Sequence, residues 1–398
     1  MEIIENLYEM TALSNLFQSP GTLIMLALGL FLLYLGIYKQ YEPLLLVPIA
    51  FGMILANSLG GGMAISTEEE IKHLTFLEIA SQYGIMNYLY YTLIKTGLLP
   101  PLIFMGVGAL TDFGPMLRNL RLAIFGAAAQ MGIFTVLIMA ILMGFSLKEA
   151  ASLGIIGGAD GPTAIYTTIK LAPHLLGPIA IAAYSYMALV PVIIPLVVKY
   201  TMNEQELKIN MKEMDKRFPP KHEIKNMRLM KILFPLFVGG LVAFFVPSSV
   251  PLVGMLLFGN LVKEIGANTL RLKEAASGPI MNAATIFLGL TVGATMTAQT
   301  FLNTKTLSIV GGGFLAFAIS IAVGIMAVKT YNLFAEKKIN PLIGATGLSA
   351  VPMASRVANE ISLRYDSRNH ILQYCMASNI SGVIGSAVAA GVLISFLN

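Results

Sequence analysis

The sequence predicts an all-α polytopic membrane protein made of two inverted structural repeats, with broken, re-entrant helices at mid-membrane. Three observations support this prediction: long apolar runs with little charge, paired motifs in the same order in both halves, and glycine and proline clusters at corresponding positions. We expect residues 1–42 to form an N-terminal segment and first transmembrane helix. Residues 43–200 are the predicted first repeat, 201–230 a charged cytoplasmic loop and 231–398 the second repeat.

The composition is that of a chain buried in lipid. Of its 398 residues, 56% are hydrophobic and 12% are charged, about half the charged fraction of an average soluble domain. Several apolar runs approach or exceed the roughly 20 residues that cross a bilayer, and they indicate at least six crossings. These runs are Gly21–Tyr38, Leu122–Phe145, Ile179–Val198, Ile232–Val246, Leu307–Val328 and Ile380–Leu397.

The charged residues fit the same interpretation. Glu2 and Glu5 precede the first run, where a secretory signal peptide would carry basic residues, so we expect a retained transmembrane helix. The net charge of +5 comes from Lys and Arg scattered through short loops, which is typical of topogenic charge and not of nucleic-acid binding. The long loop Lys199–Lys231 has an excess of basic residues, which favours a cytoplasmic position. The single Cys375 excludes an internal disulfide.

Three motifs of the first half recur in the second half in the same order. The pairs are Pro48–Asn57 (PIAFGMILAN) with Pro251–Asn260 (PLVGMLLFGN), Ile103–Ala109 (IFMGVGA) with Ile286–Ala294 (IFLGLTVGA), and Ile156–Ala164 (IGGADGPTA) with Ile343–Val351 (IGATGLSAV). Three pairs in register are hard to explain by chance, so we interpret them as a duplication. Secondary transporters are commonly built from two such repeats, with the transport site between them.

The third pair is also the least helix-like stretch of each half. Glycines and prolines gather there: Gly157, Gly158, Gly161 and Pro162 in one half, and Pro341, Gly344, Gly347 and Pro352 in the other. At this density they interrupt a helix and free backbone groups that need new partners within the protein. Paired broken segments indicate a transport site. The alternative is a pair of re-entrant turns with structural glycines only.

Asp160 lies in the first broken segment, within the apolar run IIGGADGPTAI. An ionised carboxylate at membrane depth needs a partner, and no basic residue is near it in sequence before Lys170. A bound cation such as Na⁺ fits, since a carboxylate and freed carbonyl oxygens are hard ligands. Alternatively, Asp160 caps a helix that starts near Pro162.

The second broken segment, Asn340–Asn359, supplies neutral oxygens and one cation. Asn340 and Ser349 are candidates to complete a Na⁺ shell that Asp160 begins. Arg356 is different, because its guanidinium binds carboxylates in a bidentate fork and can hold an anionic substrate group. The alternative for Arg356 is a topogenic arginine at a helix end.

Tyr186 belongs to an otherwise apolar stretch that continues to Val198. It is either an anchor at the membrane interface or a proton donor. The sequence contains no G-x-x-x-x-G-K-[ST] phosphate loop, so ATP is not expected to drive this chain directly.

Three segments resemble a known family. They are Gly157–Tyr166 (GGADGPTAIY), Ala183–Pro191 (AYSYMALVP) and Asn340–Asn359 (NPLIGATGLSAVPMASRVAN). They are similar to the β subunit of the bacterial sodium-pumping, biotin-dependent decarboxylases, which act on oxaloacetate, methylmalonyl-CoA or glutaconyl-CoA. The resemblance implies that the chain decarboxylates carboxybiotin, exports Na⁺ and consumes a proton from outside.

The resemblance also implies roles for five residues, all of which match in residue type. Asp160, Asn340 and Ser349 would hold Na⁺. Tyr186, Ser349 and Arg356 would take part in proton handling and decarboxylation, and Arg356 and Asn340 would contact carboxybiotin. Physically, Asp160 and Ser349 from opposite repeats would share one ion, with Tyr186 or Ser349 passing the proton.

The implied partners are a carboxyltransferase α subunit, a biotin carrier subunit that bears the carboxybiotin, and a small membrane γ/δ subunit. The implied location is the bacterial cytoplasmic membrane, among its lipids and without nucleic acid. The decarboxylated acid, the Na⁺ stoichiometry and formation of a homo-oligomer stay open. The runner-up is a Na⁺-coupled anion symporter or Na⁺/H⁺ antiporter without covalent chemistry. A purely structural scaffold explains neither Asp160 nor the duplicated motifs.

Overall fold

The computed structural model describes residues 20–40, 42–58, 61–219, 224–350 and 352–397, and over these ranges the chain is helical, without a strand. Within these ranges, seven helices are long and apolar enough to cross a membrane: Pro20–Ile37, Leu120–Leu142, Met227–Phe245, Pro247–Ile265, Ala267–Ala294, Thr304–Phe334 and Leu372–Leu397. Two bent helix pairs raise the number to nine if each pair is one span. The prediction of an all-α polytopic membrane protein is confirmed.

One of the six predicted crossings differs from a straight helix. The run Ile179–Val198 extends over both arms of one bent pair, Pro173–Met187 followed by Val190–Thr201, with an angle of 68° between them. A proline at each of positions 191 and 195 lies in the second arm. Proline lacks the amide hydrogen that a continuous helix needs, so the apolar run bends although its composition is that of a span.

The first half contains the helices up to the charged loop. They are α3 (Pro20–Ile37), α4 (Pro43–Ala56), α5 (Glu68–Ile71), α6 (Phe76–Leu89), η1 (Tyr90–Ile94), α7 (Leu99–Leu110), α8 (Gly114–Arg118), α9 (Leu120–Ala129), α10 (Met131–Leu142), α11 (Leu147–Gly154), η2 (Ile155–Gly158), α12 (Gly161–Leu171), η3 (Pro173–Leu175), α13 (Leu176–Ala188) and α14 (Val190–Thr201). The loop itself forms α15 (Glu204–Leu207) and α16 (Met211–Arg217).

The second half follows a similar order. Its helices are α17 (Met227–Phe245), η4 (Pro247–Ser249), α18 (Val250–Ile265), η5 (Ala267–Thr269), α19 (Leu270–Ala275), η6 (Ala276–Ile280), α20 (Met281–Ala294), α21 (Ala298–Phe301), α22 (Thr304–Phe334), α23 (Leu342–Ala345), α24 (Met353–Tyr365) and α25 (Leu372–Leu397). The first two motif pairs therefore lie on α4 with α18 and on α7 with α20.

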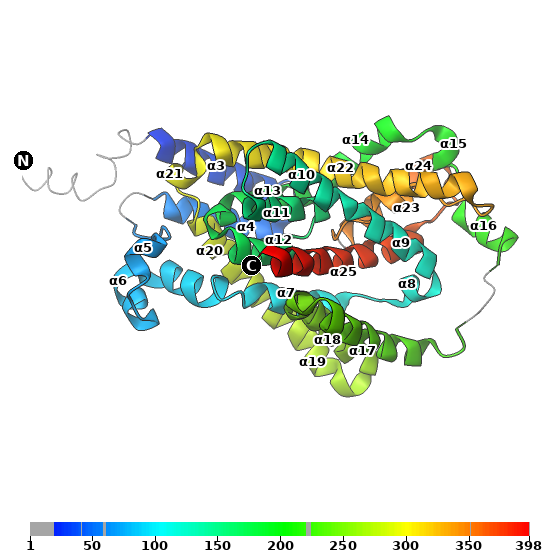
Figure 1. Ribbon diagram of the computed structural model, residues 1–398, viewed down its shortest axis with the longest axis horizontal. Helices are drawn as coiled ribbons and strands as arrows, with labels where there is room; N and C mark the ends of the chain where they lie inside the picture. The colour runs from blue at the N-terminus through cyan, green and yellow to red at the C-terminus, as the bar shows by residue number, and fades with distance from the viewer. Residues whose placement is uncertain (1–19, 41, 59–60, 220–223, 351, 398) are drawn as a thin grey trace, which may run out of the picture.

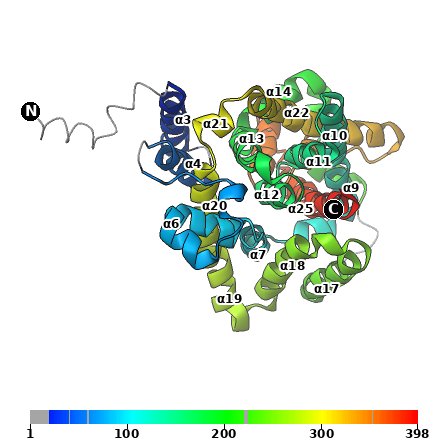
Figure 2. The same ribbon diagram turned by 60° about the vertical axis from the view of Figure 1, so that its left-hand side comes forward.

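Each of these helices packs against a helix of the other half. The helix α4 packs against α20, and α18 packs against α7, as Figures 1 and 2 show. The matched residues Asn57 and Asn260 make corresponding hydrogen bonds: the amide of Asn57 donates to the Met296 carbonyl at 2.7 Å, and that of Asn260 to the Thr111 carbonyl at 2.7 Å. Each acceptor lies two residues beyond the matched alanine of its motif. This reciprocity is consistent with the predicted duplication, whose inversion stays a prediction.

Both contacts depend on glycine. A Cβ on Gly108 would lie 1.9 Å from the Leu256 carbonyl oxygen, and one on the matched Gly293 would lie 2.1 Å from that of Ile49. These helix pairs are in backbone contact, so no larger residue fits there. A second group of helices, α9, α10, α13, α22 and α25, surrounds the broken segments.

The charged loop lies at one end of α22. Lys329 pairs with Glu206 at 2.9 Å, and Lys337 pairs with Asp215 at 2.6 Å. Both acidic residues belong to the loop helices, which lie on the right of Figure 1 together with α24. The opposite end of α22 therefore faces the other side of the membrane. The proposed repeat boundaries themselves stay predictions, and residues 1–19 lie outside the described residues.

Candidate functional site

Asp160 lies at the turn between the two arms of the first broken segment, after η2 and before α12. The preceding residue, Ala159, is buried and adopts a left-handed conformation with φ = 53°, which is uncommon for a residue with a side chain. Asp160 accepts a hydrogen bond from the Thr163 amide at 3.2 Å and caps α12. The cap that the sequence left open as an alternative is therefore present, but it uses one carboxylate oxygen only.

The second oxygen of Asp160 connects the two halves. Ser386 of α25 donates a hydrogen bond to Asp160 Oδ2 at 2.6 Å, and its hydroxyl lies 2.9 Å from that of Ser349. The amide of Ser349 also donates to the Gly158 carbonyl at 3.0 Å. The structure therefore brings the two broken segments into contact, with Asp160 and Ser349 joined through Ser386.

The carboxylate of Asp160 has no counter-ion among the described residues. Asp160 is only 5% exposed, and no ion pair joins it to a Lys, Arg or His in the part of the chain that the structure describes. Its two protein partners, an amide and a hydroxyl, are neutral. A buried carboxylate without a positive partner is costly, and a bound cation would remove that cost.

Several buried oxygens around the turn have no hydrogen-bond partner among the described residues. The oxygen Gln130 Oε1 lies 3.3 Å from the position of a Cβ on Gly158, and Ser320 Oγ lies 3.1 Å from that of Gly157. Thr163 Oγ1 belongs to the residue whose amide bonds Asp160. Neutral oxygens near a carboxylate are the ligands that hard cations take, so the residues present fit Na⁺.

The second broken segment is held by the neighbouring helices α9 and α25. Asn379 donates hydrogen bonds to the carbonyls of Thr346 and Leu348. Gln130, directly after α9, donates to the Gly347 carbonyl at 2.9 Å. These bonds satisfy the backbone carbonyls that the break in the helix sets free, and they fix Ser349 opposite Asp160.

Asn340 lies away from this site. Its amide donates to the carbonyls of Leu207 and Ile209 at 3.1 and 3.0 Å, and its side-chain oxygen accepts from the Leu342 amide at 3.0 Å. All of these contacts attach the charged loop to the start of the second broken segment. No contact of Asn340 within the described residues reaches Asp160 or Ser349, so its predicted Na⁺ and carboxybiotin roles stay predictions.

Tyr186 and Tyr184 point to different neighbours. The Tyr186 hydroxyl donates to the Val310 carbonyl of α22, and its ring contacts those of Phe314 and Phe317. The Tyr184 ring instead lies against Gly161, where an added Cβ would be 2.0 Å from Cε1. Residues two apart on a helix face nearly opposite sides. The structure therefore places Tyr184, and not Tyr186, beside the Asp160 turn.

Arg356 lies in the first turn of α24, seven residues beyond Ser349, and its side chain is exposed. It makes neither an ion pair nor a side-chain hydrogen bond with any residue that the structure describes. A guanidinium with free donors is suited to an anion in a bidentate geometry. This position is compatible with the predicted anion contact, and the topogenic alternative is not removed by it.

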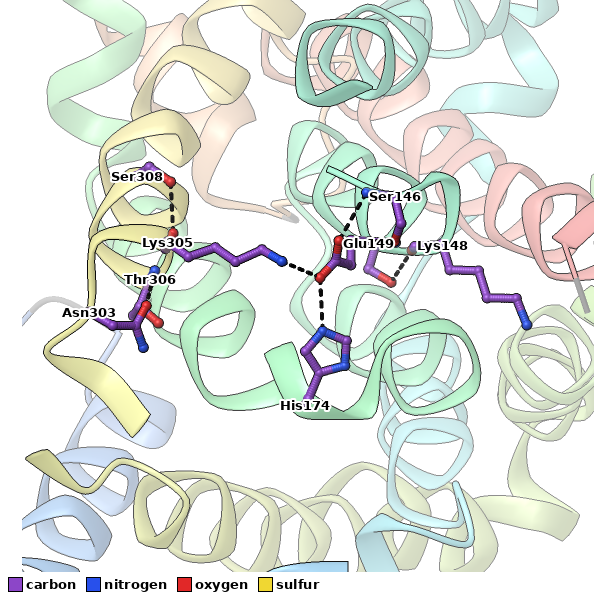
Figure 3. A network of polar contacts seen from close by, with 9 residues as sticks. Ser146, Lys148, Glu149, His174, Asn303, Lys305, Thr306 and Ser308 are labelled. Atoms are coloured by element: carbon purple, nitrogen blue, oxygen red, sulfur yellow. Dashed lines mark hydrogen bonds and ion pairs between the residues drawn. The ribbon is translucent and has the colours of Figure 1, made fainter. Parts of the chain in front are cut away.

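A charged cluster lies at the far ends of the first broken segment (Figure 3). Glu149 of α11 accepts hydrogen bonds from Lys305 of α22 at 2.5 Å and lies 2.9 Å from His174 of η3. Burial raises the pKa of Glu149, but hydrogen bonds from Lys305, His174 and Ser146 outweigh it and lower the pKa to about 2. The cluster ties both arms of the segment to α22, at the end opposite the charged loop.

Sequence reasoning missed three of the residues at this site. Gln130 is the one amide side chain in the apolar run Leu122–Phe145, and an intramembrane amide is a signal that was available. Ser386 gives no such signal, because it lies in a helix rich in small residues, where a serine is ordinary. Tyr184 was part of the quoted motif, but the sequence did not show which face of the helix meets Asp160.

A bundle of membrane-crossing helices that holds a buried carboxylate among neutral oxygens is the architecture of a cation-handling membrane protein. The family described as the Na⁺-transporting oxaloacetate decarboxylase beta subunit matches residues 21–397 of this chain. The chain belongs to this family.

The matches to named relatives cover the chain almost completely. It is 46% identical to the methylmalonyl-CoA decarboxylase subunit beta of Propionigenium modestum over 99% of each chain. It is 42% identical to the oxaloacetate decarboxylase beta chain of Klebsiella pneumoniae, over 100% of this chain and 99% of the other. The methylmalonyl-CoA decarboxylase subunit beta of Veillonella parvula is 43% identical over 96% and 94%. The protein is thus a multi-pass membrane subunit of a Na⁺-translocating decarboxylase complex.

Proposed function

We propose that the chain decarboxylates carboxybiotin and uses this reaction to export Na⁺, which binds at Asp160 between the two broken segments. The observation that carries the proposal is the hydrogen-bonded series Asp160, Ser386 and Ser349, in which a buried carboxylate of one half meets hydroxyls of the other half. An ion held there is bound fully only when both segments are in contact.

Na⁺ and a proton would compete at this carboxylate. Ser386 now donates its hydroxyl hydrogen to Asp160. When Na⁺ binds, the hydroxyls of Ser386 and Ser349 have to turn their lone pairs toward the ion, because a hydroxyl can donate or accept. Protonation of Asp160 would remove the charge that attracts the ion and release Na⁺. Proton uptake and Na⁺ release are in this way linked at one group.

Arg356 is the proposed contact for the anionic carbamate of carboxybiotin. Its exposed guanidinium has no anionic partner among the described residues and is free to take two oxygens of one ligand. When CO₂ leaves, the electron pair of the broken N–C bond stays on the ureido nitrogen, which takes up a proton. Ser349 or Tyr186 is proposed to pass that proton. The Ser349 hydroxyl lies within the site, and Tyr186 belongs to α13, the helix that also places Tyr184 beside the Asp160 turn. Asn340 keeps its proposed roles toward Na⁺ and carboxybiotin.

The remaining parts of the proposal concern the assembly. Carboxybiotin would be carried on a separate biotin carrier subunit, loaded by a carboxyltransferase α subunit, and a small membrane γ/δ subunit would complete the complex. The chain would lie in the bacterial cytoplasmic membrane, and the charged loop with α15 and α16 would lie inside the cell. The relatives are named for oxaloacetate or methylmalonyl-CoA, and the acid is proposed to be bound by the α subunit and not by this chain.

The test is Na⁺-dependent decarboxylation of free carboxybiotin by the purified complex, measured together with ²²Na⁺ uptake into inverted vesicles. The proposal expects CO₂ release that needs Na⁺ and that drives Na⁺ movement, and loss of both in Asp160→Asn. The control is Glu360→Gln, which removes an exposed carboxylate of α24 outside this site. CO₂ release at the same rate without Na⁺, or Na⁺ movement without CO₂ release, would refute it.

A further inference from the structure

A cavity of about 300 Å³ lies between α10, α11 and α22, and Asp160 is not part of its lining. Phe145 and Leu153 form one wall, and Ile309 and Leu315 form another. The only hydroxyl in the lining belongs to Ser308, which already donates to the Lys305 carbonyl at 2.7 Å. A ligand of this cavity would therefore meet apolar surface and needs no polar group of its own.

The cavity opens toward the membrane. Met143 and Leu315 at its edge are 61% and 53% exposed, and both α10 and α22 belong to helices that are long and apolar enough to cross. A Cβ added to Gly311 or Gly312 would meet no atom within 4 Å, so the chain itself leaves this space open. Hydrocarbon of the bilayer is the medium that contacts the opening.

The length of the cavity distinguishes a lipid chain from a helix. Its lining on α22 runs from Ser308 to Ile319, which is a rise of about 16 Å. This is about half of the roughly 30 Å hydrocarbon thickness, and it equals one leaflet. A transmembrane helix of a partner would need a groove across both leaflets. An acyl chain fits the observed length.

A positive charge that suits the phosphate of a phospholipid lies beside the cavity. Lys305 lies one turn before Ser308, its side chain is 51% exposed, and its ammonium lies 5.2 Å from the centre of the Phe145 ring that lines the cavity. A phosphate near this lysine would place an acyl chain beside Phe145. Because Lys305 also pairs with Glu149, we assign the specificity to the apolar cavity and only the orientation to the charge.

The geometry points to a phospholipid site in which one acyl chain of the leaflet nearest Lys305 fills the cavity between α10, α11 and α22. Its inner wall includes Ile156 of η2, four residues before Asp160. The other side of the α22 wall contacts Tyr186, whose ring carbon would lie 2.7 Å from a Cβ on Gly313. The bound acyl chain would contact the first broken segment from the membrane side and stabilise it.

The absence of Trp from the sequence allows a direct test. Single tryptophans are placed on α22 of the full chain in nanodiscs of phosphatidylglycerol, with and without brominated acyl chains. Ile309→Trp reports on the cavity, because Ile309 is 2% exposed and lines it. Ile325→Trp is the matched buried control outside the lining, and Met326→Trp, at a 54% exposed position, is the lipid-facing control.

We expect bromine to quench Ile309→Trp to the level of Met326→Trp and to leave Ile325→Trp bright. Adding Gly312→Leu should restore the fluorescence of Ile309→Trp in brominated lipid, because the leucine fills the cavity. Native mass spectrometry of the Trp-free chain should show a retained lipid that is lost in Gly312→Leu and kept in Gly240→Leu, a glycine of α17 with equal open space. The proposal is overturned if Ile309→Trp stays as bright as Ile325→Trp in brominated lipid. It is also overturned if adding another subunit protects Ile309→Trp from bromine, because a partner then fills the cavity.

Discussion

The two broken segments correspond in sequence yet differ in chemistry. Where the first carries Asp160, the matched position of the second is Gly347, whose carbonyl accepts a hydrogen bond from Gln130. The first segment thus places a charge at its turn, and the second places neutral oxygens. Their far ends differ in the same way: the ion pair of Glu149 with Lys305, beside His174, closes the first segment, while the neutral Asn340 attaches the second to the charged loop.

This difference indicates a division of roles between two copies of one structural element. One copy supplies the negative charge that a cation needs, and the other supplies hydroxyl and carbonyl oxygens and the exposed Arg356 that an anion needs. Neither segment alone has both. In the proposed reaction the two ligands would therefore bind near the contact between the segments, where a movement of one segment would affect both.

The largest expected effect comes from removing the charge that only the first segment carries. Asp160→Asn keeps the shape and the helix cap but leaves no carboxylate at the turn. Loss of a buried charge partner costs about 3–5 kcal/mol, so the apparent affinity for Na⁺ should fall by about 100-fold or more. The measurement is the Na⁺ concentration for half-maximal decarboxylation. Unchanged Na⁺ activation in a folded Asp160→Asn protein would show that the two segments do not differ in this role.

A smaller effect is expected from the cation of the second segment. Arg356→Lys keeps the charge but loses the bidentate fork, so half-saturation by carboxybiotin should need about 10-fold more ligand while Na⁺ activation stays the same. Arg364→Lys, at the last turn of the same helix, is the control. If both variants match the wild type at every carboxybiotin concentration, Arg356 is only a topogenic residue.

Some of these features were predictable from the sequence, and the reason is physical. Asn57 and Asn260 are polar groups in apolar segments, and each needs a partner. Their recurrence was visible in the sequence, and the structure shows that they bond the carbonyls of Met296 and Thr111, just beyond α20 and α7. Asp160 was found for the same reason. Ser386 was not, since a membrane-helix serine can bond its own backbone, as Ser386 also does to the Val383 carbonyl.

The positions of Asn340 and Tyr186 show the other limit. The resemblance assigned both residues a role by residue type, but residue type does not tell which way a side chain points. Asn340 bonds two carbonyls of the loop before α16, and Tyr186 bonds the Val310 carbonyl. Those contacts depend on how distant segments pack, and no local pattern in the sequence specifies them.

A third experiment sharpens the contact between the segments. Ser349→Ala and Ser386→Ala each remove one hydroxyl of the proposed Na⁺ shell, and each should weaken Na⁺ activation about 3- to 10-fold. Because both hydroxyls share one ligand, the double variant should lose less than the product of the two single effects. Ser395→Ala, whose hydroxyl bonds Ser248 at the far end of α25, serves as control. Fully multiplicative losses would mean that the two serines act at separate sites.

The smallest expected effect concerns the charged end of the first segment. Hydrogen bonds from Lys305 and His174 hold the pKa of Glu149 at about 2, below its ordinary value of 4.5. A carboxylate with a lowered pKa contributes stability above the unfolded value, and this contribution is lost as the pH falls from about 4.5 through about 2. Since Lys305 and His174 are half exposed or more, we discount the contribution to about 1 kcal/mol.

Glu149→Gln should therefore lower the melting temperature by a few degrees at pH 7, and the difference from wild type should shrink below about pH 4.5. Glu360→Gln, at an exposed position, should show no such convergence. Thermal unfolding of both variants in detergent between pH 7 and pH 3 provides the measurement. A melting-temperature difference that stays constant over this range would mean that Glu149 stabilises the protein through packing and not through its charge.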